Sequence, residues 1–223
     1  AVRSPGASVT GTARRRPWHD LADAAAEANA FYAPPMLDAA LAHLAARGDV
    51  HRIEAWDGDI AIGLLPLAVS PRHGRLPMGC VANWMHPHCF FGAPMVRAGH
   101  EAAAWRDFLA QLDAAPWAPG FLHLQALDAD GANVAALRAI CAEQRRPLRE
   151  IHRYERAMLR SSLSAEEYWE TQVRAKKRKE IRRLQKRLAD LGTVEQRRLE
   201  PGDDLREWIA AFLALESSGW KGE

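Results

Sequence analysis

Apolar residues recur every three or four positions in six stretches of the chain, which is the spacing of one face of an amphipathic helix. These stretches cover residues 18–28, 35–44, 101–112, 133–144, 164–192 and 204–219. Pro34 and Pro35 stand at the start of the second stretch, where the fixed φ of proline favours a first helical turn. We therefore expect six helices, two of them ahead of the first strand.

Shorter apolar runs bounded by turn residues predict the strands. Residues 53–56 and 60–69 flank Asp57 and Gly58, a sequence typical of a β-hairpin turn, and the long apolar second arm predicts a hairpin at the centre of a sheet. Further strands are expected within 76–91 and at 121–127, 151–159 and 194–199. Strands and helices in this mixed order predict an α/β or α+β fold, in which a mixed sheet lies between layers of helices.

The helix predicted at 164–192 is unusual for its charge. Ser164 and Glu167 form a capping-box pattern and Gly192 is a stop signal, so the pattern predicts one helix of nearly eight turns. Nine Lys and Arg and a single Glu fall within residues 174–187, a local charge of +8 in a chain whose formal net charge is +2. Such a local positive field favours a phosphate-bearing partner, although a solvated helix face is the alternative.

Composition places the chain among globular proteins. It has 223 residues and 48% hydrophobic content, with neither a secretory signal region nor an apolar run long enough to span a membrane. Its three cysteines form no C-x-x-C pair, so we expect free thiols and a reducing, cytoplasmic environment. Residues 1–17 are expected to be a flexible tail, and the ends of the chain suggest that a downstream portion is missing.

Three stretches together resemble the GNAT acetyltransferase superfamily, specifically its CelD-like branch of tandem-domain acetyltransferases, which is related to the Fem-type aminoacyl transferases. The stretches are the hairpin from Glu54 to Leu67, the basic run from Lys176 to Gly192, and the end from Phe212 to Gly222 with its Ser-Gly-Trp-Lys-Gly sequence. The resemblance implies a first GNAT-like domain at residues 18–160 and an incomplete second one at 161–223, entered through the basic helix.

This resemblance implies transfer of an acyl group, in the first instance acetyl from acetyl-CoA, to a polar acceptor such as a cell-envelope or polysaccharide precursor. The transfer would be direct, within a ternary complex. The usual pyrophosphate cradle of the superfamily is Gln or Arg, two residues, Gly, one residue, then Gly or Ala, and no such sequence occurs in the chain. The expected cofactor-binding residues therefore lie mainly beyond Glu223, and the first domain would shape the acceptor cleft.

Trp84, His86, His88 and Cys89 form the densest group of reactive side chains. Three interpretations of this group are open: a loop that lines the acceptor cleft, a soft-metal site, or simple packing. A second ligand pair at a suitable spacing is missing, so we expect no metal. If the group lines a cleft, Trp84 would bind substrate, and His86 or His88 would act as a base near neutral pH.

The basic helix and the end of the chain supply the other candidates. Phosphate of CoA or of an activated, nucleotide-linked acceptor would bind first to Arg174, Lys177, Arg178 and Arg182. The alternative is a non-catalytic module that uses this helix on nucleic acid or another polyanion, although no helix-turn-helix, zinc or aromatic-platform context accompanies it. Candidates for acceptor contacts, with Glu216 as a possible catalytic group, are Glu216, Trp220 and Lys221; the alternative is an ordinary helix end with an exposed aromatic.

Overall fold

The computed structural model describes residues 16–46, 49–157 and 159–220. The chain divides into two compact units, Ala1–Tyr154 and Glu155–Glu223. All but the last few residues of the tail predicted at 1–17 lie outside the described residues, as does Lys221.

The predicted hairpin is the framework of the first unit. β1 (Val50–Asp57) pairs antiparallel with β2 (Ile60–Ser70), and Gly58 takes a positive φ of 57° in the turn between them. Every residue of β2 from Ala61 to Leu67 is buried. β2 is the central strand because it also pairs with β3 and β4, whereas β1 is at the edge of the sheet, so only the second arm is central.

The remaining strands are short. β3 (Cys80–Asn83) follows β2, β4 (Met95–Val96) pairs with the other half of β2, and β5 (Leu122–His123) runs parallel to β3. The strand order is β1-β2-β3-β5, with β4 beside β2. The strands expected within 76–91 and at 121–127 are therefore confirmed only for a few residues each, because side-chain hydrogen bonds replace the backbone ladder beyond β3.

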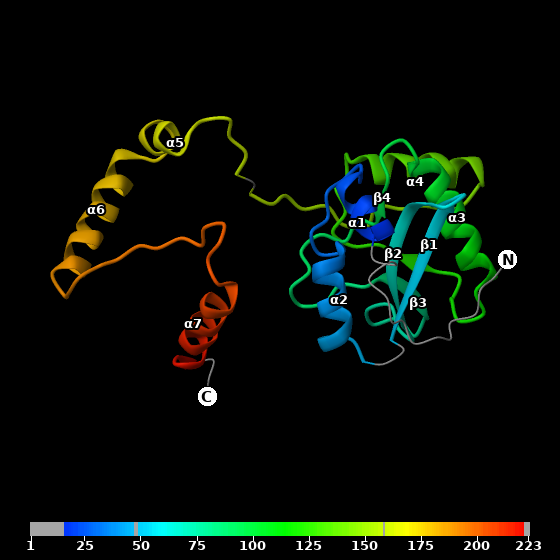
Figure 1. The fold of residues 1–223 in the computed structure, drawn as a ribbon. Coiled ribbons are helices and arrows are strands. Elements are labelled where there is room, and N and C mark those ends of the chain that lie inside the picture. The colour runs from blue at the N-terminus through cyan, green and yellow to red at the C-terminus, as the bar shows by residue number, and fades with distance from the viewer. Residues whose placement is uncertain (1–15, 47–48, 158, 221–223) are drawn as a thin grey trace. The chain divides into compact units, whose positions relative to one another are not determined.

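Helices cover both faces of the sheet (Figure 1). α1 (Arg16–Asp23) and α2 (Pro34–His43) bury Leu21 and Leu37 against one face. α3 (Glu101–Ala114) and α4 (Ala132–Glu143) bury an apolar cluster that includes Trp105 and Phe108 against the other. The first unit is thus a mixed α/β fold built in three layers, as the sequence predicts.

Residues 84–94 form neither helix nor strand, yet much of the segment is buried. Buried carbonyl groups need donors, and side chains from distant parts of the chain supply them. The Tyr32 hydroxyl donates to the Trp84 carbonyl at 2.9 Å, and Asn29 Nδ2 donates to the carbonyls of Ala93 at 2.6 Å and Phe91 at 3.2 Å. Two further buried amides, Asn83 and Asn133, donate to the carbonyls of Gly92 and Pro94. We call residues 84–94 the tethered loop.

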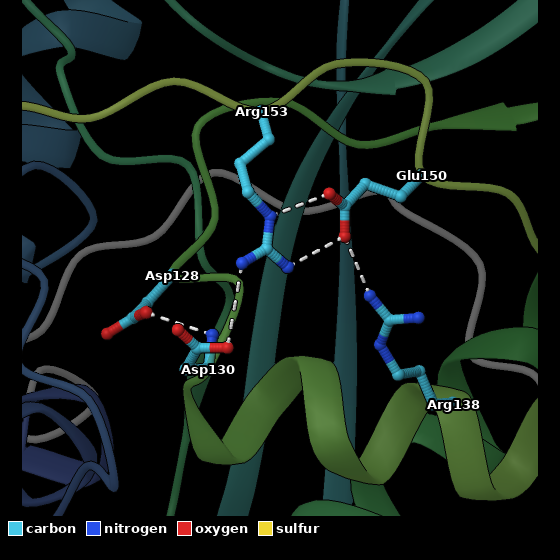
Figure 2. Close-up of polar contacts among 5 residues, drawn as sticks. All are labelled: Asp128, Asp130, Arg138, Glu150 and Arg153. Atoms are coloured by element: carbon cyan, nitrogen blue, oxygen red, sulfur yellow. Dashed lines mark hydrogen bonds and ion pairs between the residues drawn. The ribbon is translucent and has the colours of Figure 1, made fainter.

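An ion-pair cluster holds the end of the first unit (Figure 2). Glu150 accepts hydrogen bonds from Arg153 at 2.7 and 3.0 Å and from Arg138 of α4 at 2.9 Å, and Arg153 also lies 3.8 Å from Asp130. The hydrogen bonds from Arg153, and then those from Arg138, hold the pKa of Glu150 at about 2. The strand expected at 151–159 is wrong: the described residues there have no ladder partner, and side-chain ion pairs fix the beginning of the segment.

The second unit contains α5 (Ala165–Thr171), α6 (Ala175–Ala189) and α7 (Leu205–Ser217). The capping box of Ser164 and Glu167 is confirmed, but the single helix expected at 164–192 is wrong, because the chain bends at residues 172–174 (Figure 1). Thr171 donates its hydroxyl to the Glu167 carbonyl at 2.6 Å, a bond that competes with helix propagation. The strand expected at 194–199 is also wrong, since no neighbouring strand pairs with it.

None of the helices in the described ranges is both long and apolar enough to cross a membrane. The three cysteines, all within the described residues, are free, as the sequence predicts, and they are buried.

Removal of the Asn83 amide is expected to destabilise the first unit strongly. Asn83→Ala leaves the backbone carbonyls of Gly92 and Gln125 without a donor, and it leaves the backbone N–H of Gln125 without an acceptor. The free energy of unfolding should therefore fall by at least about 3 kcal/mol. Denaturant unfolding measures the change. Asn83→Asp sets a carboxyl oxygen against the same two carbonyl oxygens and should lose at least as much stability as Asn83→Ala. Gln185→Ala on exposed α6 should stay within about 0.5 kcal/mol of the parent.

Candidate functional site

The tethered loop begins directly after β3, beside the point where the parallel strand β5 ends. Ligand sites of open α/β sheets commonly lie outside the carboxyl ends of parallel strands. Trp84, His86 and His88 come together here: the Trp84 and His86 ring centroids are 5.3 Å apart, and those of His86 and His88 are 6.2 Å apart. The first unit therefore gathers the candidates that the sequence places in this loop.

His86 is buried, and its ring has a defined orientation. Its Nδ1 accepts a hydrogen bond from the backbone N–H of His88 at 3.2 Å, so the proton of the neutral ring is on Nε2. Burial, and secondly the neighbouring His88, lower the pKa of His86. In this arrangement His86 is a neutral ring that fixes the backbone of His88, and its Nε2 has no hydrogen-bond partner among the described residues.

The neighbours of His86 differ in exposure and therefore in chemistry. His88 is exposed, so its imidazole is accessible to a ligand or to solvent. Cys89 is buried, donates its Sγ–H to the Phe91 carbonyl at 3.3 Å, and has a pKa raised by burial, which disfavours the nucleophilic thiolate. Within the described ranges, no three His, Cys, Asp or Glu side chains are grouped as metal ligands would be.

The space between the carboxyl ends of β3 and β5 is filled by the chain itself. The Gly92 N–H donates to the Ala126 carbonyl at 2.9 Å, while Asn83 bonds both Gly92 and Gln125. A β-carbon at Gly92 would overlap Asn83 Nδ2 and the Gln125 carbonyl oxygen, so the backbone approaches as closely as glycine allows. Gly92, Asn83 and Gln125 therefore leave no space for a ligand between the ends of β3 and β5.

Residues 172–174 join α5 to α6, and we call this bend the elbow. Arg178 holds it in place. Its Nη1 donates to the carbonyls of Trp169, Glu170 and Val173 at 3.3, 2.7 and 2.5 Å, and its Nη2 lies 3.3 Å from the Glu170 carboxylate. The carbonyls at the C-terminal end of α5 carry negative partial charge, which a guanidinium stabilises. Only 18% of the Arg178 side chain is exposed, so the structure uses it mainly to join the two helices.

Other basic candidates surround a hollow beside this elbow. The hollow has a volume of about 480 Å³ and is lined by Gln172, Val173, Arg174, Lys176, Lys177 and Glu180. Lys177 lies 3.7 Å from Glu180, and Arg182 lies 3.4 Å from Glu170 outside the hollow. Three cations and one carboxylate line the hollow, so its lining carries a net positive charge.

The candidates at the end of the chain belong to α7 and the residues after it. Glu216 is half-buried on α7, and the Trp220 side chain is 81% exposed. Lys221 lies outside the described residues. The structure therefore gathers the candidates into a loop in the first unit, and into an elbow and a helix end in the second.

The residues that hold these sites carry no motif in the sequence. Asn29, Asn83 and Asn133 are the only asparagines of the chain, and all three are buried. Asparagine is mostly exposed in proteins, and no spacing relates these three. Their single feature detectable in the sequence is the position of Asn83 at the end of an apolar run, which is too general to identify a site.

The described residues define a three-layer α/β unit followed by a helical unit with a basic helix. No protein-family model matches the chain, and neither a curated protein nor a solved structure matches it.

The burial of His86 predicts a pH dependence of stability. Its lowered pKa means that the unfolded chain takes up the proton first as the pH falls through about 6.5, the ordinary histidine value, so the free energy of unfolding should decrease there. His123, whose pKa is also lowered by burial and by His73, contributes with the same sign. Urea unfolding between pH 7.5 and 5.5 should show this loss, reduced in His86→Gln and in His123→Gln. An unchanged slope in both variants would contradict the assignment.

Arg178→Met should loosen the elbow without unfolding α6. The methionine keeps an apolar stem but leaves three carbonyls without their donor, so amides of residues 169–174 should exchange hydrogen about tenfold faster. Arg182→Met removes only an exposed ion pair and serves as the matched control. Equal exchange rates in the two variants, read by mass spectrometry, would show that Arg178 does not hold the elbow.

Proposed function

We propose that the protein is an acyltransferase that moves an acyl group, acetyl in the simplest case, from acyl-CoA to an amine or hydroxyl of a polar, phosphate-bearing acceptor. The observation that carries this proposal is the tethered loop at the carboxyl ends of β3 and β5, which places exposed His88 beside buried, neutral His86. The resemblance of three sequence stretches to tandem GNAT acetyltransferases supports the same reaction.

The reaction needs a base at the acceptor. Direct acyl transfer forms a bond from the acceptor nitrogen or oxygen to the acyl carbon, breaks the acyl–sulfur bond, and removes one proton from the acceptor. His88 is the exposed imidazole of the loop and takes that proton, which passes finally to the leaving thiolate. His86 is a positioning residue, because its Nδ1 holds the backbone N–H of His88.

Phosphate recognition is assigned to the second unit. Arg174, Lys176 and Lys177 line the hollow at the elbow, and their charge suits a phosphate of the acceptor or of CoA. Gly92 and Asn83 are in direct contact beyond the ends of β3 and β5, so the first unit offers no phosphate site between these strands.

The proposal is tested by release of CoA thiol from acetyl-CoA. Acceptors are glucosamine, glucosamine 6-phosphate and a nucleotide-linked amino sugar, and thiol should appear only with an acceptor and faster with the phosphorylated ones. His88→Ala should reduce kcat by about 100-fold or more, because it removes the base.

The matched control is His19→Ala, which removes another exposed imidazole of the first unit and should leave the rate unchanged. Denaturant unfolding of His88→Ala should match the parent, which separates catalysis from folding. Calorimetry supplies an independent measurement of acetyl-CoA binding. Absence of both binding and thiol release with every acceptor would refute the proposed function.

A further inference from the structure

One side of α6 is a continuous surface of exposed cations. Lys177, Arg178 and Arg182 have acidic partners in Glu180 and Glu170. The other basic residues of the helix have none among the described residues, and helical spacing places them on one side; they are Lys176, Lys179, Arg183, Lys186 and Arg187. We call them the basic face.

The opposite side of α6 carries exposed leucines. Leu184 and Leu188 are 47% and 54% exposed, and Leu191, just beyond the helix, is 86% exposed. Together with half-buried Ile181 they follow the three- and four-residue spacing of one stripe, about a third of a turn from the basic face. No described residue of the second unit is buried, so within residues 155–157 and 159–220 no core covers this stripe.

We propose that α6 lies on the surface of an anionic phospholipid bilayer, with its leucine stripe toward the acyl chains and its cations at the headgroup phosphates. A helix with a basic face, an apolar stripe and low net hydrophobicity binds in the plane of such an interface, where each Lys or Arg adds to the attraction. Long basic side chains reach the phosphates while their aliphatic stems remain in apolar surroundings.

The leucine stripe favours a bilayer over nucleic acid. The phosphates of a duplex would satisfy the cations, but they would leave the leucines in water, whereas a bilayer interface accommodates both sides of the helix. Residues of α7 in the same unit add exposed apolar area: Ile209, Phe212, Leu213 and Leu215. This proposal goes beyond acyl transfer and does not depend on it, since it concerns where the protein lies and not what it converts.

The experiment is co-sedimentation of the full chain with vesicles of phosphatidylcholine alone or with 30% phosphatidylserine. Binding is expected only to the anionic vesicles, and it should weaken as salt is raised from 50 to 500 mM. Lys179→Glu/Arg183→Glu/Lys186→Glu should weaken binding by about 100-fold or more. Arg72→Glu/Arg75→Glu/Arg149→Glu changes the net charge equally at exposed positions of the first unit and should bind within about fivefold of the parent, because its basic face is intact.

A second variant separates a bilayer from a simple polyanion. Leu184→Ser/Leu188→Ser should lose most vesicle binding while keeping the parent's binding to a 20-base-pair DNA duplex, with helix content checked by circular dichroism. Vesicle binding that survives the leucine substitutions, or a duplex that competes fully with vesicles, would overturn the proposal in favour of a polyanion surface. Absence of binding to phosphatidylserine vesicles at 50 mM salt would overturn it outright.

Discussion

A buried loop without secondary structure must find partners for its backbone polar groups, and this requirement organises the first unit. Residues 84–94 pass through the interior beside the sheet, where an unpaired carbonyl would cost as much as several apolar contacts gain. Tyr32 and three asparagines satisfy these carbonyls from segments that the sheet and the helices bring together. The site loop is therefore only as stable as the packing of α1, α2 and α4 around it, and folding of the unit and shaping of the site are one event.

The basic helix of the second unit follows a different constraint. Like charges three and four residues apart repel, so a helix with this composition needs either counter-charges or an external anion. Glu170 and Glu180 neutralise the cations nearest the elbow, and Arg178 uses its charge on the carbonyls of α5. The internal compensation is concentrated at the first turns of α6, and the charges farther along the helix remain directed to the surroundings.

Local patterns predict those parts of the fold that local interactions determine. The hairpin at Asp57 and Gly58 and the helix start at Ser164 are confirmed, because a turn residue and a cap act over a few positions. The segment 151–159 is not the strand that its apolar residues predict, because a local pattern cannot supply a neighbouring strand. The bend at 172–174 depends on hydrogen bonds from Arg178 to carbonyls on the other side of the bend. The spacing of apolar residues along the chain does not predict such bonds.

In the candidate site, too, the sequence predicts local features but not the contacts between distant residues. His86 and His88 are found by the density of reactive side chains, but the tautomer of His86 follows from a backbone contact that only coordinates reveal. The closing of the space between the ends of β3 and β5 by Gly92 likewise depends on Asn83 and Gln125, which are 42 residues apart in the chain. Sequence analysis thus identifies the side chains in the loop and misses the residues that fix their geometry.

The tethers of this loop act on its carbonyl groups, which every amino acid possesses. The shape of residues 84–94 is therefore specified largely by residues outside the loop, with Gly92 as the exception where a side chain cannot fit. An exposed position such as Phe90 can exchange its side chain during evolution while the backbone path stays the same. Such a loop can acquire a new ligand specificity by single substitutions, without any change in the fold that supports it.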